Sequence, residues 1–87
     1  MRSCTTRSFW RHFDKLPQAV RQQAGKAYRL WRADPHHPSL QFKSVHATEP
    51  VYSLRVTRDY RALGLREGDM VTWFWIGSHA DYDRLIS

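Results

Sequence analysis

The sequence of 87 residues has a single cysteine, Cys4, so it can form no disulfide within the chain and offers no second sulfur ligand to a structural zinc ion. No run approaches the roughly 18 apolar residues of a membrane span, and the polar, basic start lacks the apolar core of a signal peptide. A Gly-rich phosphate loop, paired carboxylates and zinc-binding spacing are also missing. We therefore expect a cytoplasmic protein without metal, cofactor or membrane contact, whose fold depends on packing alone.

Acidic residues are scarce. Eight Asp and Glu face fourteen Lys and Arg, which gives a formal net charge of +6, and eleven of the fourteen cations are arginine. Such an excess attracts polyanions, and the planar guanidinium binds phosphate bidentately and stacks on bases in ways that lysine does not. The composition favours nucleic acid, the ribosome or an acidic protein as partner, with a merely solubilising charge as the alternative.

The length allows one domain, which we assign to residues 1–87. A chain this short buries only about 60–65% of the surface that its unfolded form exposes. Its twelve aromatic side chains, four of them tryptophan, supply large apolar surfaces at few positions. A compact core is therefore feasible without covalent links.

The first third of the chain has helical periodicity. Apolar side chains recur at three- and four-residue spacing over residues 8–16 and again over residues 17–33. Pro17 separates the two runs, because the residue before a proline avoids the α region and proline suits the first position of a helix. These runs predict two antiparallel helices, and Gly25 in the second is interpreted as a point of close approach to the first.

After the proline-bounded loop of residues 34–39 the period changes from 3.6 to 2. The alternation predicts strands over residues 40–45, 52–57, 60–65 and 70–76; the last is almost wholly apolar and should be central. Residues 79–86 can form one or two helical turns. The predicted fold is α+β: an N-terminal helical hairpin packed on a curved antiparallel sheet of about four strands, followed by a short C-terminal helical turn.

Four residues of the C-terminal half could converge on the open face of this sheet. Arg55 alternates with apolar neighbours and so should face away from the core, and Arg61 follows across a tight hairpin. His79 comes directly after the central strand, with Tyr82 close behind. Cleavage of RNA through its 2′-hydroxyl needs positive charge on the phosphate and a proton donor for the leaving oxygen. These residues could meet both needs, although an isolated arginine or histidine at a strand end is more often solvated.

The second predicted helix has a basic face. It can be solvated, contact the backbone of RNA or DNA, or receive an acidic segment of a partner. The residues are Arg21, Lys26, Arg29 and Arg32.

Three motifs of the C-terminal half resemble those of the RelE/ParE superfamily, the toxins of type II toxin-antitoxin systems. They are Tyr52-Ser53-Leu54-Arg55-Val56, Asp59-Tyr60-Arg61-Ala62-Leu63, and Trp75-Ile76-Gly77-Ser78-His79 with Tyr82. The resemblance implies the fold predicted above. It also implies a metal-independent endoribonuclease, a RelE-like mRNA interferase that cleaves mRNA on the ribosome and leaves a 2′,3′-cyclic phosphate.

The resemblance also implies roles and partners. The catalytic set would be Arg55, Arg61, His79 and Tyr82, with Arg55 and Arg61 on the phosphate, His79 as proton donor and Tyr82 in base stacking or proton transfer. RNA contacts would come from Lys43, Ser53, Arg58 and Tyr60. The basic helix face would bind a cognate acidic antitoxin, and mRNA and the ribosome would be the targets. The alternatives are a ParE-like inhibitor of DNA gyrase and an inactive toxin-like module that binds an antitoxin.

The sequence departs from the family pattern in two ways. Helical spacing begins by Phe9, which leaves little room for the usual N-terminal strand, so we expect the sheet to lack that edge strand. Ala80 stands where a second basic residue is customary, and Ser53 stands where some ribonucleases of the family have lysine. Both substitutions count against full catalytic competence.

Overall fold

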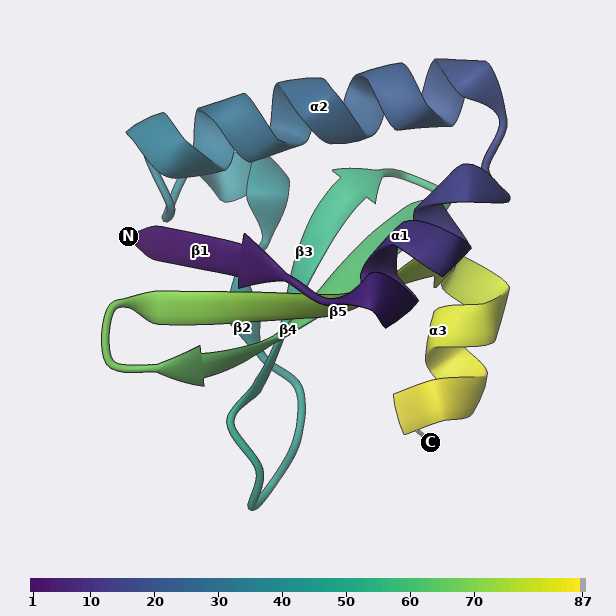
Figure 1. Cartoon of the computed structure of the whole chain (residues 1–87). Coiled ribbons are helices and arrows are strands. Elements are labelled where there is room, and N and C mark those ends of the chain that lie inside the picture. Colours follow the sequence, from purple (N-terminus) through teal and green to yellow (C-terminus); the bar gives the residue numbers. More distant parts are fainter. Residues whose placement is uncertain (87) are drawn as a thin grey trace.

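The computed structural model describes residues 1–86, which form three α-helices, a short 3-10 helix and five strands (Figure 1). Two helices precede most of the sheet and one follows it, so the predicted α+β class is confirmed. In chain order the elements are β1 (Arg2–Thr5), α1 (Arg7–Asp14), α2 (Gln18–Ala33), η1 (Pro38–Leu40), β2 (Lys43–Ser44), β3 (Val51–Thr57), β4 (Tyr60–Glu67), β5 (Met70–Ser78) and α3 (His79–Ile86).

The expectation that the N-terminal edge strand is absent is wrong. The strand order in the sheet is β1-β5-β4-β3-β2, and β1 pairs in parallel with β5. Backbone hydrogen bonds fix it at both ends, from Arg2 N–H to the carbonyl of Asp69 at 2.8 Å and from Thr6 N–H to the carbonyl of Trp73 at 3.0 Å. The polar residues Arg2–Thr5 show no apolar alternation, which is why periodicity did not reveal the strand.

The strand predicted over residues 40–45 is also largely wrong. Pro38–Leu40 form a turn of 3-10 helix, and Gln41 adopts a left-handed conformation with φ of 46°, which interrupts any extended run. Only Lys43–Ser44 pair with β3. Leu40 is nevertheless buried, with 2% of its surface exposed. Its alternation with Phe42 therefore marked burial but not a strand.

The other three predicted strands are confirmed as β3, β4 and β5. A bulge in β5 determines on which face of the sheet its side chains lie. Leu63 pairs with Trp75 while Gly64 pairs with Trp73, so Phe74 is the extra residue on β5. As a result Trp73 packs in the main core with the helices, whereas Trp75 packs on the opposite face. Without the bulge, residues two apart on a strand would share a face.

Both N-terminal helices cover one face of the sheet, where buried residues of α2 and of β3, β4 and β5 form the main core. The hydroxyl of Thr6 caps α1 by accepting from the N–H of Phe9 at 3.1 Å. Trp31 on α2 is fully buried and meets the ring of Trp73 edge-on at 5.3 Å between centroids. Within residues 1–86, no helix is long and apolar enough to span a membrane.

The interpretation of Gly25 as a point of close helix approach is wrong. A Cβ built on Gly25 would meet only the Arg29 guanidinium, at 3.6 Å, and no atom of α1 lies within 4 Å of it. Gly25 instead lines an apolar cavity between the two helices. The helical hairpin is therefore open at this level.

The opposite face of the sheet carries a smaller core of Leu63, Trp75 and Tyr82, with Tyr82 contributed by α3. Figure 1 shows α3 (yellow) at the end of β5, on the side of the sheet away from α2. The predicted C-terminal helical turns are thus confirmed as a helix of eight residues. Its packing leaves the part of this face at the β3-β4 hairpin for charged side chains.

The close fit of Trp73 over Gly64 leads to a stability prediction. A Cβ on Gly64 would lie 2.5 Å from Val71 Cγ1 and 2.9 Å from Trp73 Cε3, so Gly64→Ala should destabilise the protein by about 1–3 kcal/mol through overpacking. Gly25→Ala is the matched control, since it meets only ordinary contacts and should stabilise α2 by about 1 kcal/mol. Urea unfolding of both variants measures the two effects. An unchanged midpoint for Gly64→Ala would contradict the packing described here.

Candidate functional site

Arg55 on β3 and Arg61 on β4 are direct partners across the ladder, so their side chains share a face. This is the face of Leu63, opposite the N-terminal helices. Arg61 Nη1 donates to the carbonyls of Thr57 at 3.0 Å and Tyr60 at 3.4 Å. Partial burial lowers the pKa of Arg61, and the charge of Arg55 lowers it further. Two like charges held together in this way form a site that an anion would stabilise.

The C-terminal helix α3 places a histidine, His79, and a carboxylate, Asp83, near the arginine pair. Gly77 is the β5 partner of Arg61, and two residues later the N–H of His79 donates to the carbonyl of Asp59 at 2.7 Å. The imidazole Nε2 lies 3.3 Å from Asp83 Oδ2, four residues along α3. Its Nδ1 is buried and has no hydrogen-bond partner among residues 1–86.

The pKa of Arg61 also depends on two residues of α3. Tyr82 and Asp83 both raise the pKa of Arg61, against the effects of burial and of Arg55. The ring of Tyr82 lies 5.6 Å from that of His79. The four residues expected to form the catalytic set are therefore grouped around the end of the β3-β4 hairpin and the start of α3.

Burial changes the roles that two predicted residues can have. Ser53 is 2% exposed, so its side chain is not displayed for an RNA contact. Tyr82 is 6% exposed and packs with Leu63 and Trp75, so it offers no open ring face on which a base could stack. Its contact with the His79 ring instead fits a positioning role.

The other predicted RNA contacts lie in three different places. Lys43 is exposed and pairs with Ser53, which puts it on the face of the arginine pair. Tyr60 alternates with Arg61 and packs against the main core, on the opposite face. Arg58 lies in the exposed β3-β4 turn, where it lines a hollow of about 390 Å³ together with Lys26 and Arg55. Lys43 and Arg58 thus extend the charged surface, while Tyr60 does not.

The cations of α2 divide between two surfaces. Lys26 belongs to the hollow near Arg55, whereas Arg29 lies against Gly25 and Arg32 lies 6.0 Å from the ring of Tyr28. Gly25 and Tyr28 both line the cavity between the helices. Arg21 is one helical turn before Gly25, so it continues the same side. The helix has four cations and no carboxylate.

The sequence interpretation missed Asp83. Its spacing of four residues from His79 was the available signal, because residues at i and i+4 are neighbours on a helix. Among residues 1–86, no three His, Cys, Asp or Glu side chains come together as a metal site. The ionisable side chains grouped at this surface are Arg55, Arg61, His79, Tyr82 and Asp83.

A family model described as the ParE-like toxin domain matches residues 18–84, which include every element of this surface. The chain belongs to the ParE-like toxin family. No curated protein sequence matches the chain significantly.

Solved structures of a toxin and of toxin-antitoxin complexes share the fold of the chain at low sequence identity. A chain of the RelB-RelE antitoxin-toxin complex from Methanococcus jannaschii matches with a TM-score of 0.76 at 12% identity, over 97% of this chain and 99% of that one. A chain of the RelBE2 complex from Mycobacterium tuberculosis matches with a TM-score of 0.71 at 19% identity, over 92% of each chain. The YoeB/ParE toxin from Agrobacterium tumefaciens matches with a TM-score of 0.68 at 14% identity, over 91% of this chain and 99% of that one.

The opposed arginines generate a prediction about stability. Like charges directly opposite in a sheet destabilise it, so Arg55→Gln should raise the free energy of unfolding by about 0.2–1 kcal/mol at low salt. The gain should shrink in high salt, which screens the repulsion. Arg58→Gln, in the adjacent turn, is the control and should change little. A loss of stability in Arg55→Gln would mean that Arg55 makes a structural contact and not a repulsive one.

Proposed function

We propose that the chain is an mRNA interferase that cleaves RNA at the surface formed by Arg55, Arg61, His79 and Tyr82. The carrying observation is the direct pairing of Arg55 with Arg61, with His79 two residues beyond the β5 partner of Arg61. Positive charge placed where a phosphate gains charge, beside an imidazole that can donate a proton to the leaving oxygen, is what cleavage through a 2′-hydroxyl requires.

In the proposed reaction the 2′-hydroxyl gives its proton to water and its oxygen attacks the adjacent phosphorus. The bond from phosphorus to the 5′-oxygen breaks, so the products are a 2′,3′-cyclic phosphate and a 5′-hydroxyl. Arg61, held by the carbonyls of Thr57 and Tyr60, and Arg55 stabilise the charge on the phosphate oxygens. His79 protonates the leaving 5′-oxygen. The ring of Tyr82 holds the imidazole in place, 5.6 Å away.

The surroundings support a polyanionic substrate and an acidic partner. Lys43 lies on the face of the arginine pair. The hollow lined by Lys26, Arg55 and Arg58 extends the positively charged surface around the edge of the sheet at β3. Such a basic surface binds the backbone of mRNA and of ribosomal RNA through phosphate contacts. On α2 the remaining cations, Arg21, Arg29 and Arg32, are the proposed contacts for a cognate acidic antitoxin.

Substitutions of the proposed proton donor, His79, and of a proposed phosphate contact, Arg61, test the reaction. His79→Ala should lower the rate of RNA cleavage by about 10²–10⁴-fold, and Arg61→Ala should lower it by about 10²–10³-fold. Both should restore growth to cells that express the chain alone. His36→Ala, an exposed loop histidine, and Arg11→Ala, an exposed arginine on α1, are matched controls that should leave cleavage unchanged. The rate is measured on purified ribosomes with a defined mRNA, and far-UV circular dichroism checks folding.

The ParE-like family model favours inhibition of DNA gyrase as the second candidate. This activity would need the basic surface but not the proton donor. Cells would then filament with damaged DNA while their mRNA remained intact, and His79→Ala would stay toxic. That outcome would replace the interferase proposal, whereas mRNA cleaved with a 2′,3′-cyclic end would exclude the second candidate.

A further inference from the structure

The imidazole of His79 has an orientation that its own burial does not explain. Nδ1 is enclosed and has no hydrogen-bond partner among residues 1–86, while Nε2 lies 3.3 Å from Asp83 Oδ2. The side chain as a whole is 45% exposed. A buried polar atom left unpaired carries its full desolvation cost, so each one in a folded protein needs a physical reason.

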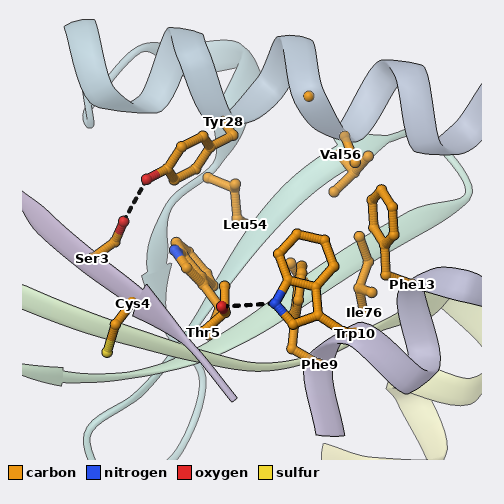
Figure 2. Close-up of a pocket in the computed structure, with 14 residues that line it drawn as sticks. Ser3, Cys4, Thr5, Phe9, Trp10, Phe13, Tyr28, Leu54, Val56 and Ile76 are labelled. Atoms are coloured by element: carbon orange, nitrogen blue, oxygen red, sulfur yellow. Dashed lines mark hydrogen bonds between the residues drawn. The ribbon is translucent and has the colours of Figure 1, made fainter. Parts of the chain in front are cut away.

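Polar atoms of other aromatic rings in the chain do find partners, even near solvent. Figure 2 shows an example at the apolar cavity between α1 and α2, where Trp10 Nε1 donates to Thr5 Oγ1 at 2.8 Å although Trp10 is 47% exposed. Two indole nitrogens in the main core share the unpaired state of His79 Nδ1; they belong to Trp31 and Trp73. His79 differs from both because it lies at the candidate site.

A half-turn of the His79 ring about its χ2 bond would remove the desolvation cost. The half-turn exchanges Nδ1 with Cδ2 and Nε2 with Cε1, and χ2 of histidine has two such broad orientations. A C–H group would then occupy the enclosed position, and no nitrogen would be buried without a partner. The same half-turn would place a carbon where Nε2 now faces Asp83. The observed orientation therefore keeps the contact with Asp83 at the expense of Nδ1.

Stabilisation of α3 does not account for this contact. The side chains of His79 and Asp83 are 45% and 60% exposed, and exposed ion pairs contribute little to folding. Their order along the helix is also unfavourable, because His79 is the first residue of α3 and a cation there meets the positive end of the helix dipole. The main consequence of the contact is thus the direction in which the imidazole points.

The carboxylate of Asp83 also acts on the arginine pair. Its charge raises the pKa of Arg61, so Asp83 lies within electrostatic reach of both Arg61 and His79. Asp81, two residues earlier, lies on nearly the opposite side of the helix and pairs with Arg84. Of these two carboxylates of α3, Asp83 is the one that faces the candidate site.

We propose that Asp83 is a positioning residue of the cleavage reaction, which keeps the His79 ring turned so that Nε2 faces the leaving 5′-oxygen. The inference rests on the proposed function, in which His79 is the proton donor. Because Nδ1 is enclosed, the proton must come from Nε2. The Nε2–H bond of the imidazolium breaks as an O–H bond forms on the 5′-oxygen, which leaves a neutral imidazole with its proton on Nδ1. The proton that the 2′-hydroxyl gave to water restores Nε2–H, and Asp83 stays ionised throughout.

Kinetics of Asp83 variants test the positioning role. Asp83→Ala should lower kcat for cleavage of a defined mRNA on purified ribosomes by about 10–100-fold, since a ring that turns over no longer presents its proton correctly. KM should not rise, because loss of a negative charge beside the arginine pair favours a polyanion. Asp83→Glu keeps a carboxylate at this spacing and should restore most of kcat. Asp81→Ala, on the other side of α3, is the matched control and should change neither constant.

A double variant shows whether Asp83 acts through His79. If it does, adding Asp83→Ala to His79→Ala should cause no further loss of kcat, because two residues that work as one unit are not additive. A further tenfold loss in the double variant would mean that Asp83 acts on the reaction by itself, which would overturn the positioning role.

Nuclear Overhauser contacts of the His79 ring provide a readout that needs no cleavage. In the wild-type chain the Cδ2 hydrogen lies on the side of the ring away from the enclosed position. In Asp83→Ala the ring should turn over, so this hydrogen should gain contacts with the protein interior. Asp81→Ala should give the wild-type pattern, and far-UV circular dichroism checks that each variant is folded.

The two sets of measurements separate this inference from the proposed function. A wild-type kcat in Asp83→Ala, or a ring that does not turn over, would overturn the role of Asp83, and the interferase proposal would stand if His79→Ala is inactive. A wild-type chain that leaves mRNA intact, with a ring that turns over in Asp83→Ala, would reject the interferase proposal. The control of the His79 orientation by Asp83 would then remain.

Discussion

The fold depends on the coverage of both faces of β5. Trp73 and Trp75 lie two positions apart, yet the extra residue at Phe74 sends them to opposite faces, where each becomes part of a different core. Each indole also lies against a glycine: Trp73 against Gly64 on β4, and Trp75 against Gly77 on its own strand. A side chain at either glycine would occupy the space of an indole, so these four positions are mutually determined.

This arrangement also builds the candidate site. Gly77 is the β5 partner of Arg61, and because it has no side chain the indole of Trp75 can lie there while Arg61 turns toward the carbonyls of Thr57 and Tyr60. The chain then leaves the sheet at Ser78 and starts α3 with His79. Tyr82 returns from α3 to pack on Trp75. The second core and the charged surface are therefore parts of one structure.

Sequence patterns predicted the elements whose apolar residues recur at a regular spacing. The helices and the strands within Val51–Thr57, Tyr60–Glu67 and Met70–Ser78 follow from apolar periodicity, and the pairing of Arg55 with Arg61 follows from the short hairpin between them. A structural feature that depends on one residue produces no such periodic pattern. The bulge at Phe74 and the left-handed Gln41 each depend on one position, and neither residue type demands its conformation. The edge strand Arg2–Thr5 is specified by pairing with β5 and not by its own alternation.

Apolar periodicity also could not predict which polar side chains are buried. Ser53 alternates correctly to the face away from the helices, but α3 and the loop bearing Val45 supply a second core there, which converts an expected open position into a buried one. The same effect encloses Tyr82. Alternation assigns a side chain to a face, whereas tertiary packing decides whether that face meets solvent.

The distribution of charge suggests why so small a domain tolerates strain at this face. Arg55 and Arg61 repel each other across the ladder, and Arg61 is partly desolvated, so both effects oppose folding of a chain with little stability to spare. Natural proteins retain such local costs where a ligand removes them. An anion between the two guanidinium groups would cancel the repulsion, so binding and folding would reinforce each other at that point. The repulsion that weakens the free protein is then the one that a bound anion would relieve.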